Sequence, residues 1–247
     1  MILILKNLLK KIFSYYLWLE LSFYYQKFKY NILNQYSSRG EIDIELKKIL
    51  KHKQNGFFLE IGAYNGYSES VSLRFEKELG WNGLLIEPNP VHFKYLKKNR
   101  PENICLNLTC LDKSSLKKKL YIKNLNQMSY IVDNKNNLYS SHYPKNRINN
   151  LAKKSLSGNF EKFKCNIETL ENIFYKYSIK KIDLAIIDVE GSEIELLRGI
   201  NFNNINIKYF CIESYNFDKL NKFMKKNNYK FLKKIHKEDY VYRKYNS

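Results

Sequence analysis

Five apolar runs along the chain have the composition of buried β-strands. They are Phe57–Ile61, Gly83–Glu87, Asn103–Cys110, Ile182–Asp188 and Ile205–Glu213. The runs are largely hydrophobic rather than strictly alternating, which is typical of strands that are covered on both faces of a sheet. The pattern therefore predicts a central sheet with helices packed on both sides.

Between these runs, apolar residues recur at intervals of three and four, the spacing of amphipathic helices. In the first such segment, Ile42, Leu46 and Leu50 share one face and Lys residues occupy the other. The predicted helices cover residues 42–50, 68–79, 90–99, 167–177, 192–198 and 218–227, and two short strands follow near 229–235 and 240–242. Alternating strands and helices imply a mostly parallel sheet with right-handed crossovers, so the expected fold class is α/β.

Two segments depart from this alternation. Residues 1–40 form an N-terminal helical segment of their own, and residues 41–247 make up the α/β domain. Within the domain, residues 113–164 are polar, rich in Asn, Lys, Ser and Tyr, and without clear periodicity. Long loops of this kind often cover a substrate, so we expect residues 113–164 to be an insertion that serves as a substrate lid.

The N-terminal segment is rich in Leu, Ile, Tyr and Phe, but charged residues interrupt it. Its longest uncharged stretch, Ile12–Leu19, is too short to span a bilayer, which takes about 20 apolar residues. The pattern favours an amphipathic helix that packs on the domain or on a second copy in an oligomer. The alternative is a helix that lies on an anionic membrane surface. We expect a cytoplasmic protein, peripheral at the inner face of the membrane in the second case.

The chain is strongly basic, with 43 Lys and Arg residues against 24 Asp and Glu residues and a net charge of +19. Nucleic acid, an anionic membrane or an acidic glycan could each bind such a surface, and Lys residues that merely cover solvated faces are the other interpretation. Most of the cations are Lys, which weakens the case for base-specific recognition of nucleic acid. None of the four Cys residues forms a C-x-x-C pair, so buried reduced thiols are expected.

The most informative sequence feature joins the first two predicted strands. The first strand leads into Glu60 and a turn with the spacing E-x-G-x-x-x-G, in which Tyr64 lies between Gly62 and Gly66. The second strand ends in Glu87. A carboxylate at this position can accept hydrogen bonds from both hydroxyls of a ribose, and a glycine turn lets a ligand approach the backbone. The combination predicts a nucleoside site, although the turn lacks the G-x-G-x-x-G pattern of dinucleotide enzymes.

Further carboxylates follow the other strands. Asp112 comes after the third strand, where it would either accept a hydrogen bond from the base of a bound nucleoside or form a turn. Asp188 and Glu190 follow the fourth strand, and Glu213 ends the fifth. The carboxyl ends of parallel strands meet in one crevice. We therefore expect the last three side chains to orient a substrate, act as a base or hold a divalent cation, with helix capping as the alternative for Glu190.

Histidines add one candidate. His142, in the polar middle segment, is the best candidate for a further base, with an ordinary surface histidine as the alternative. The chain has no H-E-x-x-H or H-x-H spacing, which speaks against a histidine-bound metal. It also has no G-x-S-x-G turn and no Walker A loop, so a serine hydrolase or a P-loop NTPase is disfavoured.

Taken together, these stretches resemble the FkbM family of S-adenosylmethionine-dependent methyltransferases. The sequences GWNG…IEPNP and IDVEGSE are specific in combination, and the resemblance covers roughly residues 55–243. The matching stretches are Phe58–Gly66, Phe75–Gly83, Ile86–Pro90, Thr169–Leu170, Ile182–Glu193, Leu197–Gly199 and Ile212–Glu213. The N-terminal segment and residues 113–164 lie outside the strong match.

The resemblance implies a Rossmann-like class I methyltransferase fold, in which seven strands have the order 3-2-1-4-5-7-6. It implies that S-adenosylmethionine binds at Glu60, Gly62 and Glu87, with the adenine near Asp112. The full set of expected cofactor contacts is Glu60, Gly62, Ala63, Tyr64, Gly66, Glu87, Pro88, Asp112 and Asp188. Such families usually methylate a hydroxyl, often on a sugar or a polyketide.

The expected chemistry is therefore O-methylation. Because a sulfonium is already a strong electrophile, alignment of the reacting atoms does much of the work, and a base or metal assists the hydroxyl. We assign this assistance to Asp188 and Glu213, with Glu190 and His142 as further candidates, and Asp188 and Glu213 would also hold any divalent cation. The expected acceptor is a sugar hydroxyl in a capsule or lipopolysaccharide precursor, or a related small molecule.

Two other functions remain open on the sequence. A nucleotide-sugar-modifying oxidoreductase would need a nicotinamide cofactor, and the missing G-x-G-x-x-G turn argues against it. A non-enzymatic nucleic-acid-binding protein would use the charge of +19, but acidic side chains at the strand ends would repel phosphate. We therefore expect no nucleic-acid partner.

Overall fold

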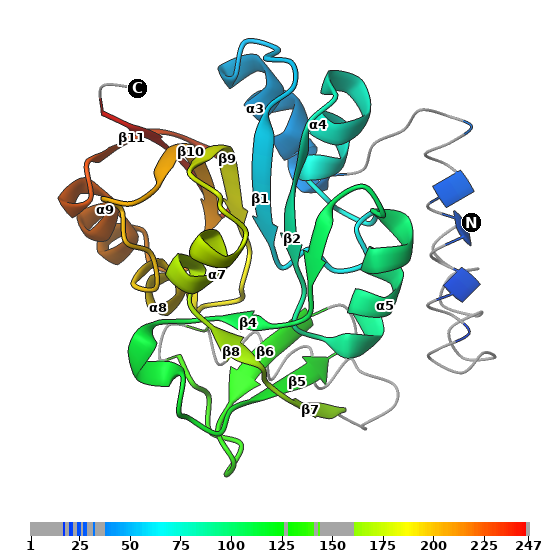
Figure 1. Cartoon of the computed structure of the whole chain (residues 1–247), viewed down its shortest axis with the longest axis vertical. Coiled ribbons are helices and arrows are strands. Elements are labelled where there is room, and N and C mark those ends of the chain that lie inside the picture. Colours follow the sequence, from blue (N-terminus) through cyan, green and yellow to red (C-terminus); the bar gives the residue numbers. More distant parts are fainter. Residues whose placement is uncertain are drawn as a thin grey trace.

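The computed structural model describes residues 38–125, 128–140, 143 and 161–245, together with isolated positions between residues 17 and 32. His142 and most of the N-terminal segment lie outside the described residues, so the predictions made for them stay predictions. In the described part, a seven-stranded sheet forms the centre and helices lie on both sides of it (Figure 1). No helix in this part is long and apolar enough to cross a membrane.

The central sheet has the strand order β11-β12-β10-β9-β1-β2-β3. Its strands are β1 Phe57–Ile61, β2 Asn82–Ile86, β3 Ile104–Leu106, β9 Lys181–Ile187, β10 Asn206–Glu213, β11 Tyr229–His236 and β12 Asp239–Lys244. β1 pairs in parallel with β2 and β9, whereas β12 is antiparallel to both β10 and β11. Counted from β3 in chain order, this is 3-2-1-4-5-7-6, so the predicted fold class and strand order are confirmed.

Side chains of β1 alternate between the two faces of the sheet. Leu59 and Ile61 belong to one buried cluster, and Phe58 belongs to the other. The first cluster includes side chains of α7 Leu170–Lys176, α8 Glu193–Leu197 and α9 Phe217–Lys226, and the second those of α3 Ile42–Ile49, α4 Ser72–Leu79 and α5 Pro90–Asn99. β1 is therefore buried on both faces, as its largely apolar run predicts.

The third strand of the central sheet is shorter than predicted. It ends at Leu106, and the side chain of Asn107 then donates hydrogen bonds of 2.8 and 3.1 Å to the carbonyl oxygens of the two residues after β2. The chain leaves the central sheet at this point. β4 Thr109–Cys110 pairs instead with β8 Ile167–Glu168 in a separate two-stranded sheet.

Two helices begin later than predicted. α7 starts at Leu170 rather than at residue 167, because the side chain of Thr169 accepts a hydrogen bond from the backbone three residues ahead and caps the helix. α4 starts at Ser72 rather than at residue 68. Here the carboxylate of Glu60 accepts hydrogen bonds from the backbone N–H groups of Val71 and Ser72, so the preceding residues remain a loop.

The polar segment 113–164 contains more order than predicted. After the short 3-10 helix η2 Lys113–Ser115, β5 Tyr121–Leu125 pairs antiparallel with both β6 Met128–Val132 and β7 Lys162–Lys164. Ile122 of this small sheet is buried in a hydrophobic cluster separate from the two clusters of the central sheet. Figure 1 shows β5 and β6 beyond the ends of β1 and β2, where they can form one wall of a site.

Candidate functional site

A cavity of about 350 Å³ lies at the carboxyl ends of β1, β2 and β9. Gly62, Glu87 and Asp188 line it, and each directly follows one of these strands. Ile122 and Ile131 of the small sheet contribute another part of the lining. Ligands of open parallel sheets bind at this edge, and small-molecule sites have volumes of about 300–1,000 Å³. The cavity is therefore placed and sized for a small ligand.

The cavity is acidic although the chain as a whole is basic. Its described lining includes the acidic residues Glu60, Glu69, Glu87, Asp188 and Glu190, and no Lys or Arg. The complete chain carries a net charge of +19. Charges that line a cleft dominate the local field, so this cavity favours a ligand with positive charge and disfavours one with phosphates.

Glu87 is held in a defined orientation at the end of β2. It is 4% exposed, and its two carboxylate oxygens accept hydrogen bonds from the backbone N–H groups of Tyr64 at 2.8 Å and Asn89 at 2.9 Å. An ionised carboxylate has about four lone-pair sites, so acceptor capacity remains for two further donors. The geometry thus suits the predicted contact with ribose hydroxyls.

A close contact within the protein requires glycine at position 62. Its φ is +86°, and a Cβ here would lie 1.9 Å from the backbone oxygen of Asp188. The N–H of Gly62 donates to the carbonyl of Ile86 at 3.0 Å, and the N–H of Asp188 donates to that of Ile61 at 3.1 Å. Gly62 therefore lets the turns after β1 and β9 meet in direct backbone contact beside the cavity.

Of the other predicted cofactor contacts, Ala63, Tyr64 and Pro88 line the cavity. Gly66 is absent from its described lining. Gly66 has a φ of +77°, and a Cβ there would lie 2.7 Å from Cγ of Arg100. The glycine at position 66 therefore makes room for this arginine.

Asp112 is also absent from the described lining of the cavity. Its carboxylate accepts hydrogen bonds from the hydroxyls of Ser114 at 2.8 Å and Ser115 at 2.7 Å, at the start of η2. Burial raises the pKa of Asp112 and these two hydrogen bonds lower it, so that the pKa lies below its ordinary value. The observed contacts are those of a turn, and the contact with adenine stays a prediction.

Asp188, Glu190 and Glu213 come together as predicted. Each offers one carboxylate oxygen, and these three atoms all lie within 4.8 Å of one another. The hydroxyl of Tyr215 lies 3.3 Å from an oxygen of Glu190 and 3.4 Å from one of Glu213, with the tyrosine as donor. Carboxylates this close suit either a divalent cation or the removal of a proton from a hydroxyl.

Glu193 is a fourth acidic residue that the sequence did not single out. It is 2% exposed and accepts a hydrogen bond of 2.6 Å from the N–H of Gly191. Burial raises the pKa of Glu193, the hydrogen bond from Gly191 lowers it, and the charges of Glu213 and Glu190 raise it further. The resulting pKa is about 8. Glu193 is therefore mostly protonated at neutral pH. In the sequence it has the pattern of an ordinary acidic residue in the first turn of a helix.

His92 is the second residue that sequence reasoning missed. It lines the cavity, is 1% exposed, and its Nδ1 lies 3.8 Å from Glu87. Its ring meets that of Tyr64 edge-on, with 4.4 Å between the centroids. Nε2 is buried and makes no hydrogen bond to any described residue. The signal was present, because His92 and Leu96 are one helical turn apart on the buried face of α5.

Three solved structures resemble this chain at low identity. The METTL16 methyltransferase domain is 11% identical with a TM-score of 0.43, over 83% of this chain and 66% of that one. A TehB-like SAM-dependent methyltransferase from Corynebacterium glutamicum is 10% identical with a TM-score of 0.44, over 90% and 96%. TrmK from M. capricolum, solved with S-adenosylhomocysteine, is 10% identical with a TM-score of 0.37, over 81% and 66%. The chain thus spans just under two thirds of the first and third proteins.

A comparison with curated proteins finds no match. The profile of the methyltransferase FkbM domain, in contrast, matches residues 60–231. This range is well over half of the 247 residues, begins at the end of β1 and includes Glu87, Asp188 and Glu213. The strand order and the cavity at the carboxyl ends of the strands agree with that assignment. The chain therefore belongs to the methyltransferase FkbM domain family and has the fold of S-adenosylmethionine-dependent class I methyltransferases.

Proposed function

We propose that the protein is an S-adenosylmethionine-dependent O-methyltransferase. Its acceptor is a hydroxyl of a sugar in a surface-glycan precursor, or of a related small molecule. The observation that carries the cofactor assignment is the acidic cavity, lined in its described part by five acidic residues and no Lys or Arg. S-adenosylmethionine brings a sulfonium and an ammonium group, which this field attracts. A nicotinamide dinucleotide would bring a pyrophosphate, with no described cation in the lining to neutralise it.

Glu87 and the turn at Gly62 are the proposed cofactor contacts. The oriented carboxylate of Glu87 binds the ribose hydroxyls, with its position secured by the backbone of Tyr64 and Asn89. Leu108 and Cys110 line the cavity beyond Pro88 and supply apolar surface for the base. These residues offer the combination of apolar walls and a few placed polar groups that small-molecule sites share.

The acidic cluster is the proposed catalytic centre. S-adenosylmethionine supplies an electrophilic methyl group when it is bound. Asp188, with Glu213 beside it, accepts the proton that the acceptor hydroxyl loses as its oxygen bonds to the methyl carbon and the carbon–sulfur bond breaks. General-base assistance of this kind contributes about 10²- to 10⁴-fold in rate.

The same cluster provides a second way to activate the hydroxyl. The oxygens of Asp188, Glu190 and Glu213 are close enough to bind one divalent cation, which would lower the pKa of the acceptor hydroxyl. Chelation distinguishes the two mechanisms. Activity that survives EDTA supports the carboxylate base, and activity that is lost with EDTA and restored by Mg²⁺ supports the cation.

The sugar acceptor is supported by the groups around the cluster. Clustered carboxylates accept hydrogen bonds from several hydroxyls at once, which matches a polyhydroxylated ligand. Tyr215, whose ring stands edge-on to that of Tyr143 with 5.9 Å between centroids, adds an aromatic surface next to them. Because the described lining has no Lys or Arg, phosphates or acidic sugars of the precursor would contact the basic surface outside the cavity, which the net charge of +19 suits.

A location at the inner membrane face belongs to the same proposal. The described N-terminal positions include exposed apolar side chains at helical spacing, namely Leu17, Leu21, Tyr24, Tyr25, Phe28 and Ile32. An apolar stripe on a basic protein is suited to an anionic membrane surface. The alternative is packing on the domain, where Nζ of Lys98 lies 5.9 Å from the ring centroid of Tyr24, or contact with a second copy. Association with anionic vesicles separates membrane binding from this alternative.

The catalytic assignment is tested with Asp188→Asn, which keeps the size of the side chain and removes its charge. We expect kcat to fall by about 10²- to 10⁴-fold, with a much smaller change in the Kd for S-adenosylmethionine measured by calorimetry. Asp183→Asn is the matched control: Asp183 is a buried carboxylate on β9, the strand that Asp188 follows, but it pairs with Lys53 rather than lining the cavity. An unchanged kcat in Asp188→Asn would show that Asp188 is not the base.

A further inference from the structure

The carboxylate of Glu60 is fully used within the protein. One oxygen accepts hydrogen bonds from the backbone N–H groups of Val71 at 2.9 Å and Ser72 at 3.4 Å. The other accepts from the hydroxyls of Ser70 at 2.9 Å and Ser72 at 2.5 Å. An ionised carboxylate has about four lone-pair sites, and here four donors occupy them. Glu60 therefore has little capacity left to bind a ligand.

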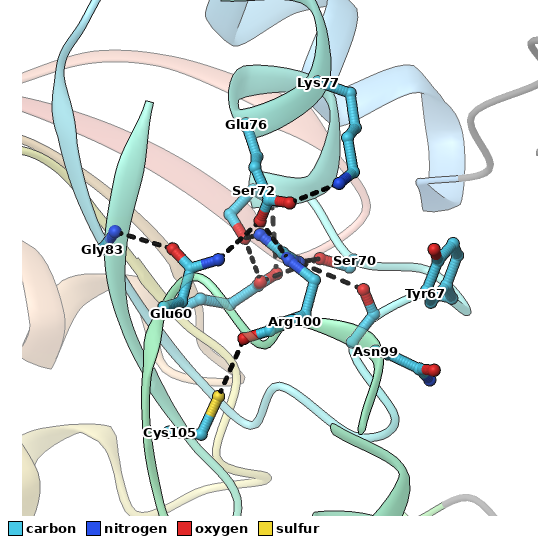
Figure 2. Close-up of polar contacts among 12 residues, drawn as sticks. Glu60, Tyr67, Ser70, Ser72, Glu76, Lys77, Gly83, Asn99, Arg100 and Cys105 are labelled. Atoms are coloured by element: carbon cyan, nitrogen blue, oxygen red, sulfur yellow. Dashed lines mark hydrogen bonds and ion pairs between the residues drawn. The ribbon is translucent and has the colours of Figure 1, made fainter. Parts of the chain in front are cut away.

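Arg100 is hydrogen-bonded to the same two serines, as Figure 2 shows. It is fully buried, and its Nη1 and Nη2 donate to the hydroxyl oxygens of Ser70 at 3.2 Å and Ser72 at 3.0 Å. A guanidinium only donates and a carboxylate only accepts. Both serine hydroxyls must therefore accept from Arg100 and donate to Glu60, which fixes the direction of each hydrogen bond.

Arg100 also holds the beginning of the loop after β1. Its Nη1 donates to the carbonyl of Gly66 at 3.1 Å, and the neighbouring Asn99 donates to the carbonyl of Asn65 at 2.8 Å. Arg100 therefore bonds to Gly66 before and Ser70 after Ser68 and Glu69, which line the cavity. The loop that borders the cavity is thus tied at both of its ends to the end of α5.

The opposite end of α5 supports Glu87. The N-cap residue Asn89 donates its N–H to Glu87, and Nδ1 of His92, in the first turn of the helix, lies 3.8 Å from the same carboxylate. α5 therefore connects the two elements that border the cavity. Its start orients Glu87, and Arg100 at its C-cap orders the loop after β1.

The charges of this network require a guanidinium. Arg100 pairs through Nε with Glu76, so that one buried cation lies between the carboxylates of Glu76 and Glu60. Burial raises the pKa of Glu76, but the charge of Arg100 lowers it, and the pKa lies below its ordinary value. A Lys ammonium is a compact charge without the planar fork, so it cannot reach Glu76, Gly66 and both serines together.

We propose that Arg100, acting through Ser70 and Ser72, is the positioning residue of the cofactor-binding loop. In this arrangement Glu60 completes the network rather than contacting the cofactor. This inference rests on the proposed binding of S-adenosylmethionine in the cavity. It assigns to α5 the role of holding the ribose carboxylate and the loop at a constant separation.

The test compares Arg100→Lys with Arg74→Lys. Arg74 also has a guanidinium paired with two carboxylates, but these belong to Asp43 of α3 and Glu78 of α4 rather than to the loop after β1. In Arg100→Lys we expect the Kd and KM for S-adenosylmethionine to rise about tenfold or more, with a smaller change in kcat. Arg74→Lys should leave both constants unchanged even where it lowers Tm.

A second variant covers the case in which Arg100→Lys fails to fold. The double substitution Ser70→Ala and Ser72→Ala removes the two bridging hydroxyls and leaves Arg100 paired with Glu76; it should raise the Kd in the same direction. Wild-type affinity in the folded double variant, or an equal loss in Arg74→Lys, would overturn the positioning role. If the wild-type protein itself does not bind S-adenosylmethionine, the proposed function fails before the variants are compared.

Discussion

Replacing Gly62 with Ala perturbs the contact that joins the turns after β1 and β9. The residue has a φ of +86°, and the new methyl group would lie 1.9 Å from the backbone oxygen of Asp188. A backbone oxygen cannot rotate away as a side chain can. The substitution must therefore move one of the two turns that border the cavity.

The expected loss of stability has two parts. An Ala in the left-handed region costs about 1–2 kcal/mol, and overpacking against fixed atoms costs about 1–3 kcal/mol more. Gly80→Ala isolates the first part. Gly80 has a φ of +66°, but its nearest obstacle is the side-chain oxygen of Asn55 at 2.9 Å, which can move. Gly62→Ala should therefore be less stable than Gly80→Ala by about 1–3 kcal/mol.

Urea denaturation followed by tryptophan fluorescence measures the free energy of unfolding of both variants. Calorimetry should show weaker binding of S-adenosylmethionine for Gly62→Ala only, because only that turn borders the cavity. Equal losses of stability in the two variants would refute the contact between Gly62 and Asp188. Unchanged cofactor affinity in Gly62→Ala would show that the contact between Gly62 and Asp188 does not shape the cofactor site.

Three further predictions concern charge. Glu87→Gln should raise the Kd for S-adenosylmethionine about 10- to 100-fold, because hydrogen bonds to a charged group are lost; an unchanged Kd would contradict ribose binding at Glu87. In metal-free buffer, Glu193 should make the free energy of unfolding fall by about 1.4 kcal/mol per pH unit between about pH 4.5 and 8, since the folded state keeps a proton that the unfolded state loses. Glu193→Gln should lack this contribution, and identical pH profiles would refute it. Association with anionic vesicles should weaken as salt is raised, and absence of binding at low salt would count against a membrane location.

The central sheet was predictable because its strands are buried on both faces. Leu59 and Phe58 face opposite helix layers, so hydrophobic residues occupy both faces of this strand. The small sheet was not predictable in the same way. In β7, exposed Lys162 and Lys164 flank Phe163, and such a short alternation in a Lys-rich segment has no distinct signal.

Element boundaries depended on side chains from elsewhere in the chain. Glu60 fixes the start of α4 by accepting from the N–H groups of Val71 and Ser72, and Asn107 ends β3 by donating to carbonyls after β2. Local secondary-structure propensity gives no information about either contact. Sequence reasoning therefore identified these elements but placed their ends wrongly.

The same distinction between local and long-range effects applies to the candidate site. Asp188 and Glu213 were expected to converge because Asp188 follows one strand and Glu213 ends its parallel neighbour, and the topology alone brings them together. The burial of Glu193 and the hydrogen bonds of Glu60 depend on long-range packing. A spacing of residues along the chain cannot distinguish a carboxylate that binds a ligand from one that binds its own protein.

A crystal structure of the chain soaked with S-adenosylhomocysteine tests the cofactor site most directly. We expect both ribose hydroxyls within hydrogen-bond distance of Glu87, the nucleoside next to Gly62, and no contact with Glu60. A cavity that stays free of ligand, or a ligand bound elsewhere on the protein, would contradict the proposed function.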